Sequence, residues 1–184
     1  MGYMYRVKLL AALKKIISSS SSSSRLEIKG TDCPFTKLLI TYFLNFLQEK
    51  ISISVPRLKV HIKKIKKEQG GFVDFSKFLK GEYSIIIAND LSPLDMLVML
   101  AHEYIHLVQF VKKDLQVSED KKSLIWKGKS FGVDDYDKAK TKKIDHANFP
   151  WEKQAHEMQE ELVIQFKSST QMQELKNKAG LQPK

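Results

Sequence analysis

Two histidines and a glutamate on one predicted helix carry the clearest chemistry in the sequence. His102, Glu103 and His106 lie within residues 96 to 111, MLVMLAHEYIHLVQFV, and are the only acidic or histidine side chains of that stretch. A helix that is apolar nearly all round is buried at the centre of a domain. Burying a carboxylate and two imidazoles costs several kcal/mol unless something compensates them, and a metal dication does so most directly.

The spacing of the two histidines suits a single ion. Four residues advance a helix by slightly more than one turn, so His102 and His106 can both direct a ring nitrogen at one metal. Glu103 is turned by about 100° from His102, which leaves its carboxylate beside the ligands. This is the H-E-x-x-H arrangement, in which zinc activates water and the glutamate accepts its proton. We therefore predict His102 and His106 as Zn2+ ligands and Glu103 as the catalytic general base.

A catalytic zinc needs a third protein ligand and one open position. The candidates lie on a predicted last helix, which begins at Pro150 and runs to about Phe166. Glu152 is on its first turn and His156 follows four residues later on the same face, so helix geometry allows either as the ligand. His156, with the adjacent Glu157, can alternatively support the ligands from outside the coordination shell or stabilise the transition state.

Together, the H-E-x-x-H at 102 to 106 and the later Pro-Trp-Glu-x-x-Ala at 150 to 155 resemble the motifs of gluzincin metallopeptidases, especially small SprT-like and phage-type peptidases. The resemblance covers about residues 34 to 166. It implies Glu152 as the third ligand and Ala155 as the small residue that lets two helices approach. It further implies a zinc metalloendopeptidase that acts on a protein or peptide substrate.

Other polar and aromatic side chains are weaker candidates. His146, Tyr136 and Tyr104 can each polarise the oxyanion of a transition state, although Tyr104 is expected to pack in the core. His61 lies among lysines on a predicted strand and is expected to be solvated. Trp126 is expected to help cover the core, but a hairpin near a cleft is also where a peptide can add as a strand.

The helices that must position these residues are predicted from apolar spacing and start signals. Residues 34 to 50 form an amphipathic helix that packs on a core. The active-site helix begins with Ser92 as N-cap and Pro93 in the first turn, and ends near Lys112. Residues after Ser168 are predicted to be a frayed tail.

The strands are predicted from alternation and turn residues. Residues 55 to 65 are read as an exposed strand, and a turn at Gln69-Gly70-Gly71 leads into a second short strand at 72 to 75. Residues 83 to 88 are apolar on both faces and therefore form a central strand. Residues 116 to 149 are polar, with a hairpin expected at 126 to 129.

The predicted fold class is α+β: a small zincin-like domain, with a short three-stranded sheet packed on the active-site helix and with N-terminal and C-terminal helices. We divide the chain into a basic amphipathic N-terminal segment (1–17), a Ser-rich linker (18–30), a metallopeptidase domain (31–168) and a polar tail (169–184).

Charge and composition limit the partners. The net charge is +10, but only three of the 31 basic residues are arginine, which argues against specific nucleic-acid readout. Six basic side chains and one acid among residues 1 to 30 leave weak, non-specific contact with nucleic acid or an anionic membrane open.

The cysteine content and the length of the apolar segments indicate the cellular compartment. The single cysteine, Cys33, excludes an intrachain disulfide and fits a reducing compartment. The N-terminal apolar stretch LLAAL is too short for a signal peptide, and no run reaches the roughly 18 residues of a membrane span. We expect a cytoplasmic protein. Because the resemblance extends to phage-type peptidases, the protein can also be phage-encoded.

The sequence is compatible with three functions. The first is peptide-bond hydrolysis through metal-activated water. The second is a non-catalytic zinc-stabilised interaction module, phage- or DNA-associated, that keeps the site for folding. The third is proteolysis of DNA-bound proteins, which the basic N-terminus suits but which lacks support from a zinc ribbon or an arginine cluster. An open fourth coordination position and an accessible cleft would separate the first from the second.

Overall fold

The computed structural model describes residues 26–53, 55, 57–65, 70–74, 82–119, 122–132 and 146–180. The elements in chain order are β1 (Glu27–Lys29), α2 (Pro34–Ile51), β2 (Leu58–Lys63), β3 (Gly71–Asp74), β4 (Tyr83–Ala88), α3 (Pro93–Val111), β5 (Leu115–Val117), β6 (Ser123–Trp126), β7 (Lys129–Gly132), the 3-10 helix η2 (His146–Asn148), α5 (Pro150–Lys167) and α6 (Thr170–Ala179). The predicted α+β class is confirmed. The basic segment 1–17 and Tyr136 lie outside the described residues.

The main sheet has four strands in the order β1-β2-β4-β3, so the prediction of three strands is wrong. The strands β1, β2 and β4 run parallel, and β3 pairs antiparallel with β4 at the edge. The central place of β4 is confirmed, since it lies between β2 and β3 and since Ile86 on one face is buried as well as Ile85 and Ile87 on the other. The additional strand, β1, comes from the end of the predicted linker at 18–30. Three residues carry too little alternation to be recognised before their partner is known.

Strand β2 is not the exposed strand that the sequence predicts. It lies between β1 and β4, and its alternate residues Leu58, Val60 and Ile62 are buried. Although β3 follows β2 in the chain, the two strands are not neighbours, because β4 lies between them. A strand that is apolar on both faces is buried, and its backbone groups must then be paired at both edges; β4 pairs with β2 on one side and with β3 on the other.

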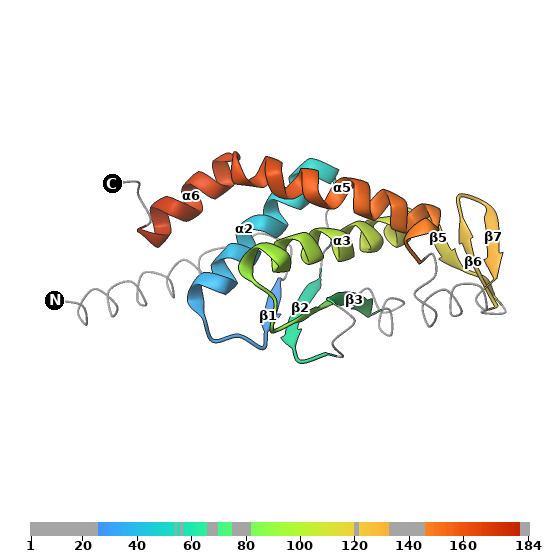
Figure 1. Ribbon diagram of the computed structural model, residues 1–184, viewed down its shortest axis with the longest axis horizontal. Coiled ribbons are helices and arrows are strands. Elements are labelled where there is room, and N and C mark those ends of the chain that lie inside the picture. Colours follow the sequence, from blue (N-terminus) through green and yellow to red (C-terminus); the bar gives the residue numbers. More distant parts are fainter. Residues whose placement is uncertain are drawn as a thin grey trace.

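Helix α3 lies in the middle of three layers, with the sheet on one side and α5 on the other (Figure 1). Its approach to the edge strand depends on a glycine: a Cβ at Gly71 would stand 2.9 Å from Met99 Cγ and 2.9 Å from Ile86 O. Among the described residues, α3 alone has the length and hydropathy of a membrane span, and 56% of that window is buried inside the protein. Such burial is the pattern of a central helix of the fold.

The chain end differs from its prediction as a frayed tail. Helix α6 is capped by Ser169, whose hydroxyl accepts from Met172 N at 3.1 Å, and by Gly180 in the left-handed region at φ 68°. Its Leu175 is only 1% exposed, and the helix packs beside α2 (Figure 1). The polar composition of α6 does not predict a helix. The helix is stabilised by packing on α2.

A second, three-stranded sheet of order β5-β6-β7 lies at the other end of the molecule. The hairpin predicted at 126 to 129 is confirmed, with Lys127 and Gly128 in the turn at φ 46° and 84°. Trp151, at the start of α5, stacks on Phe149 at 4.7 Å and meets the Phe131 ring edge-on at 5.2 Å. The hairpin is thereby fastened to the helix that begins with the Pro-Trp-Glu motif.

Candidate metal centre

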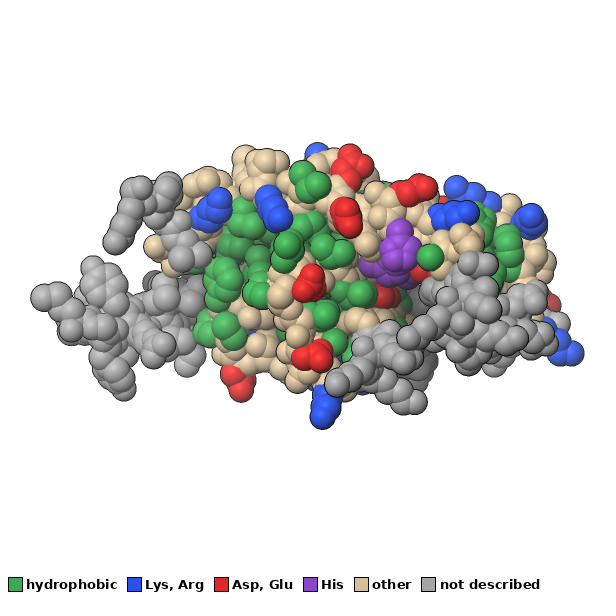
Figure 2. Space-filling model, in the orientation of Figure 1, with side chains coloured by type: hydrophobic (Ala, Val, Ile, Leu, Met, Phe, Trp, Pro, Cys, Tyr) green, Lys and Arg blue, Asp and Glu red, His purple; other side chains and the backbone are tan. Residues whose placement is uncertain are grey.

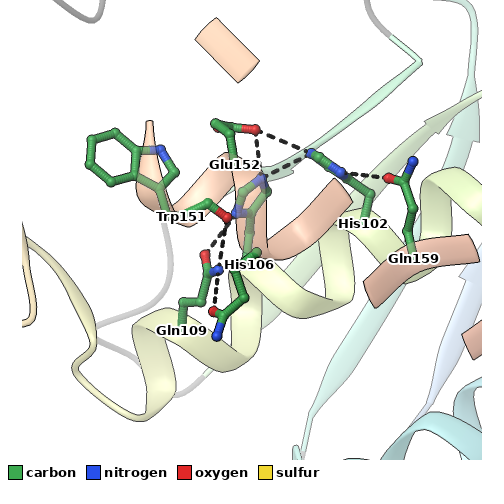
Figure 3. Close-up of polar contacts among 7 residues, drawn as sticks. His102, His106, Gln109, Trp151, Glu152 and Gln159 are labelled. Carbon is green, nitrogen blue, oxygen red and sulfur yellow. Dashed lines mark hydrogen bonds and ion pairs between the residues drawn. The ribbon is translucent and has the colours of Figure 1, made fainter. Parts of the chain in front are cut away.

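His102, His106 and Glu152 come together between α3 and α5 (Figure 3). The Nε2 atoms of the two histidines are 3.0 Å apart, and Glu152 Oε2 lies 3.4 Å from the first and 3.3 Å from the second. One ligand atom from each residue falls within 4.8 Å of the others, a group that could hold a metal ion. Their side chains are only 11%, 12% and 3% exposed.

Local features of α5 place the carboxylate. Pro150 occupies its first turn, and the preceding Phe149 has the extended backbone of an N-cap residue, as the sequence predicts for the start of this helix. Trp151 is 1% exposed and anchors that turn in the aromatic cluster. Ala155 is fully buried, and this small side chain fits the close packing of α5 against α3. Glu152 therefore points inward rather than into solvent.

The outer ring nitrogens of both histidines are held by glutamines that the motif does not include. His102 Nδ1 lies 2.8 Å from Gln159 Oε1, and His106 Nδ1 lies 2.9 Å from Gln109 Oε1. A histidine ligand commonly donates its second N–H to such a partner, which leaves the inner nitrogen bare for a metal. With the Nδ1 hydrogen of each ring donated to its glutamine, the two Nε2 lone pairs meet at 3.0 Å beside a carboxylate, an arrangement that a cation between them would stabilise.

The electrostatics of His106 favour that positive charge. Burial by itself lowers its pKa, but the hydrogen bond and charge of Glu152, with Glu103 adding to them, outweigh burial and raise the pKa above its usual value. The same negative surroundings that favour a proton also favour a cation.

Glu103 lies next to the group without belonging to it. It is 5% exposed, and burial raises the pKa of its carboxyl, while the charges of His106 and His102 act in the opposite direction. A hydrogen bond from the backbone of Val73 on β3 also lowers that pKa. The carboxylate thus lies within electrostatic reach of the histidines and beside the edge strand.

His156, the alternative ligand, lies on the solvent side of the site. Its ring centroid is 4.8 Å from that of His102, at a 54° tilt, and the residue is exposed. Partial burial and the charge of His102 lower its pKa. The next residue, Glu157, is exposed. Among the described residues, the converging group contains Glu152 and neither of these two.

Tyr104, His61 and Trp126 are not part of the converging group, and the side chain of His146 lies outside the described ones. Tyr104 is fully buried and donates to the carbonyl oxygen of Ile53 at 3.2 Å, as expected for a packed side chain. His61 is on β2, in register with Lys29 of the neighbouring strand. Trp126 lies 6.4 Å from Trp151, between ring centroids, in the aromatic cluster. His146 begins η2, just before α5.

Two imidazole nitrogens and one carboxylate oxygen form a donor set that suits a first-row divalent cation. The side chains of His102 and His106 keep a small exposed fraction. Figure 2 shows histidine side chains at the surface on one face of the molecule, with acidic side chains nearby. Comparisons with protein-family models, curated proteins and solved structures find no match to this chain.

Proposed function

We propose that this protein is a zinc-dependent metallopeptidase in which His102, His106 and Glu152 hold the ion and Glu103 is the general base. The observation that carries the proposal is the convergence of three ligand atoms within 4.8 Å, with a fourth buried side chain, the Glu103 carboxylate, beside them. Structural zinc sites usually have four protein ligands, whereas catalytic ones have three and an open position.

The donor set supports zinc as the ion. Two histidines and one glutamate are a known ligand set of catalytic zinc. When bound, zinc lowers the pKa of water to about 7 and polarises the carbonyl of the scissile bond. Glu103 accepts the proton of the attacking water and then donates it to the leaving amine. Its burial holds the carboxylate in a low-dielectric environment, where its interaction with the forming charges is strong.

The edge strand supports a peptide substrate. Strand β3 is the last strand of the main sheet, and it passes Glu103 at Val73. An extended peptide that pairs with β3 would gain backbone hydrogen bonds and would lie beside the strand that contacts Glu103. The hairpin of β6 and β7 offers a second strand edge near the start of α5.

A non-catalytic, zinc-stabilised interaction module is the second candidate, phage- or DNA-associated, and one observation favours it. The ligands come from α3 and α5, so an ion would link two helices across the centre of the fold. Binding to the folded state alone would then stabilise the domain. Both candidates suit a reducing, cytoplasmic compartment, since Cys33 is the only cysteine.

The test compares wild-type protein with Glu103→Gln. Zinc content is measured first, and cleavage of casein is then followed at equal protein concentration. We expect Glu103→Gln to keep its zinc and to lose cleavage, because the amide cannot accept the proton. Glu157→Gln is the matched control, an exposed glutamate on α5 that should retain both zinc and cleavage.

Each result bears on one candidate. Wild-type protein that holds zinc but cleaves nothing would favour the interaction module. Equal cleavage by Glu103→Gln and wild type would exclude the general-base role.

A further inference from the structure

Gln109 is a buried polar residue to which the H-E-x-x-H motif assigns nothing. It lies three residues after His106 on α3 and is 1% exposed. An amide in such a position costs free energy unless its oxygen and nitrogen are both satisfied. Its hydrogen bonds therefore show what the residue does.

Gln109 makes three contacts, which reach from one ligand helix to the other (Figure 3). Its Oε1 lies 2.9 Å from His106 Nδ1. Its Nε2 donates to the backbone oxygen of Trp151 at 3.0 Å and to Gln154 Oε1 at 2.9 Å. Both of these partners are on α5, and Trp151 immediately precedes Glu152 in the chain.

These contacts fix which way the amide faces. A backbone carbonyl can only accept, so the atom of Gln109 that faces Trp151 O must be the nitrogen. The oxygen then faces His106, and His106 Nδ1 must carry the hydrogen that it donates. In the neutral ring this leaves Nε2 unprotonated, and Nε2 is the atom that lies 3.3 Å from Glu152 Oε2.

We propose, on the basis of the metal site of the proposed function, that Gln109 is a positioning residue that couples His106 to Glu152. One end of the amide sets the tautomer and ring orientation of His106. The other end holds the first turn of α5, and hence the backbone from which Glu152 projects. A single side chain thereby sets the spacing of a nitrogen ligand and an oxygen ligand that lie 46 positions apart in the chain.

Two substitutions separate the contacts. Gln109→Met keeps the length of the side chain and removes every hydrogen bond. Gln109→Glu can still accept from His106 Nδ1, but its second oxygen would face the carbonyl of Trp151 and repel it. If Gln109 couples the two ligands, both variants must weaken metal binding.

The experiment measures the affinity of the full chain for Zn2+ and Co2+ by competition with a chromophoric chelator. We expect both Gln109 variants to bind about 10- to 100-fold more weakly than wild type, the usual loss when a partner of a ligand is removed. The absorption spectrum of the Co2+ form should also change, because it reports ligand geometry. General destabilisation would not produce that change.

Two control variants complete the design. Ile164→Ala shortens an exposed side chain of α5 and leaves every bond of Gln109 in place. Tyr104→Phe removes a buried hydrogen bond elsewhere on α3, to Ile53 O. Both should bind the ion within twofold of wild type.

The outcomes distinguish this inference from the proposed function. Wild type that takes up neither ion would refute the metal site. If wild type binds, the coupling role is overturned by a Gln109→Met or Gln109→Glu affinity equal to wild type. It is equally overturned if Tyr104→Phe loses as much affinity as they do.

Discussion

The two halves of α5 bury different kinds of side chain. The first half buries Glu152, at 2% exposure, together with Trp151 and Ala155. The second half buries apolar side chains only, and its Phe166 packs against the rings of Phe43 and Phe46 at 4.9 and 5.5 Å. Apolar burial stabilises a fold by itself, whereas a buried carboxylate costs stability unless a cation offsets it. The first half thus supplies the carboxylate of the site. The second half mainly stabilises the fold, apart from Gln159 at its start, which holds His102 Nδ1.

The largest expected effect comes from the second half. Phe166→Ala should lower the free energy of unfolding by about 3–5 kcal/mol, because it leaves a cavity among aromatic rings. Zinc affinity of the protein that remains folded should not change. Chemical denaturation and chelator competition measure the two quantities. Ile164→Ala is the control: this side chain is 64% exposed, so the change should stay within about 0.5 kcal/mol.

A substitution in the first half of α5 should lower zinc affinity. Glu152→Ala should weaken zinc binding by more than the roughly 100-fold cost of losing an outer partner, since a ligand itself is removed. Metal analysis after dialysis measures this. His156→Ala should keep its zinc, because the exposed ring lies outside the converging group. The opposite result, zinc lost only in His156→Ala, would transfer the third-ligand role to His156.

Removal of the metal should lower the stability of the folded protein only when Glu152, in the first half of α5, is present to hold the ion. At a zinc concentration 100 times its dissociation constant, binding adds about 2.7 kcal/mol, which corresponds to about 5–10 °C in Tm for a protein of this size. A chelator should abolish that increment in wild type and in Ile164→Ala. Glu152→Ala should show no zinc-dependent shift in differential scanning calorimetry. A full shift in that variant would mean that the ion binds elsewhere.

The smallest change in stability is expected for Tyr104→Phe. It tests whether a buried polar side chain of α3 outside the ligand group is independent of zinc, unlike the buried Glu152 of α5. Tyr104→Phe removes the bond to Ile53 O and should cost about 0.5–1.5 kcal/mol, the net value of one hydrogen bond. Since the phenol donates to Ile53 O and does not belong to the converging group, the same cost is expected with and without zinc. A loss that appears only in the zinc-bound protein would connect Tyr104 to the site.

The sequence predicts those elements whose signals lie close together in the chain, and it misses those that depend on distant partners. Helices α2, α3 and α5 follow their predicted bounds within one or two residues, and the hairpin turn at Lys127-Gly128 is also confirmed. Each has signals within a few positions of the chain: apolar spacing, an N-cap, a proline or a turn glycine. Strand β1 and helix α6 were missed, because both are short and depend on distant partners for their stability.

The same distinction divides the candidate site. His102, Glu103 and His106 are recognisable because four residues along a helix define a face without any tertiary information. Gln109 carried a weak signal, as the single amide among the apolar residues that follow His106. Gln159 carried none, since it meets His102 from another helix, 57 positions away in sequence.

The sequence by itself determined which side chains share a helical face and where the helices begin, since these depend on backbone geometry over one or two turns. The packing of α3 on α5 decided that Glu152 rather than His156 joins the two histidines in one group, and that two glutamines hold their outer nitrogens. Helix geometry allowed both residues, because position 156 lies one turn from position 152. Only the rotation of α5 against its neighbour turns one of them inward and leaves the other in solvent.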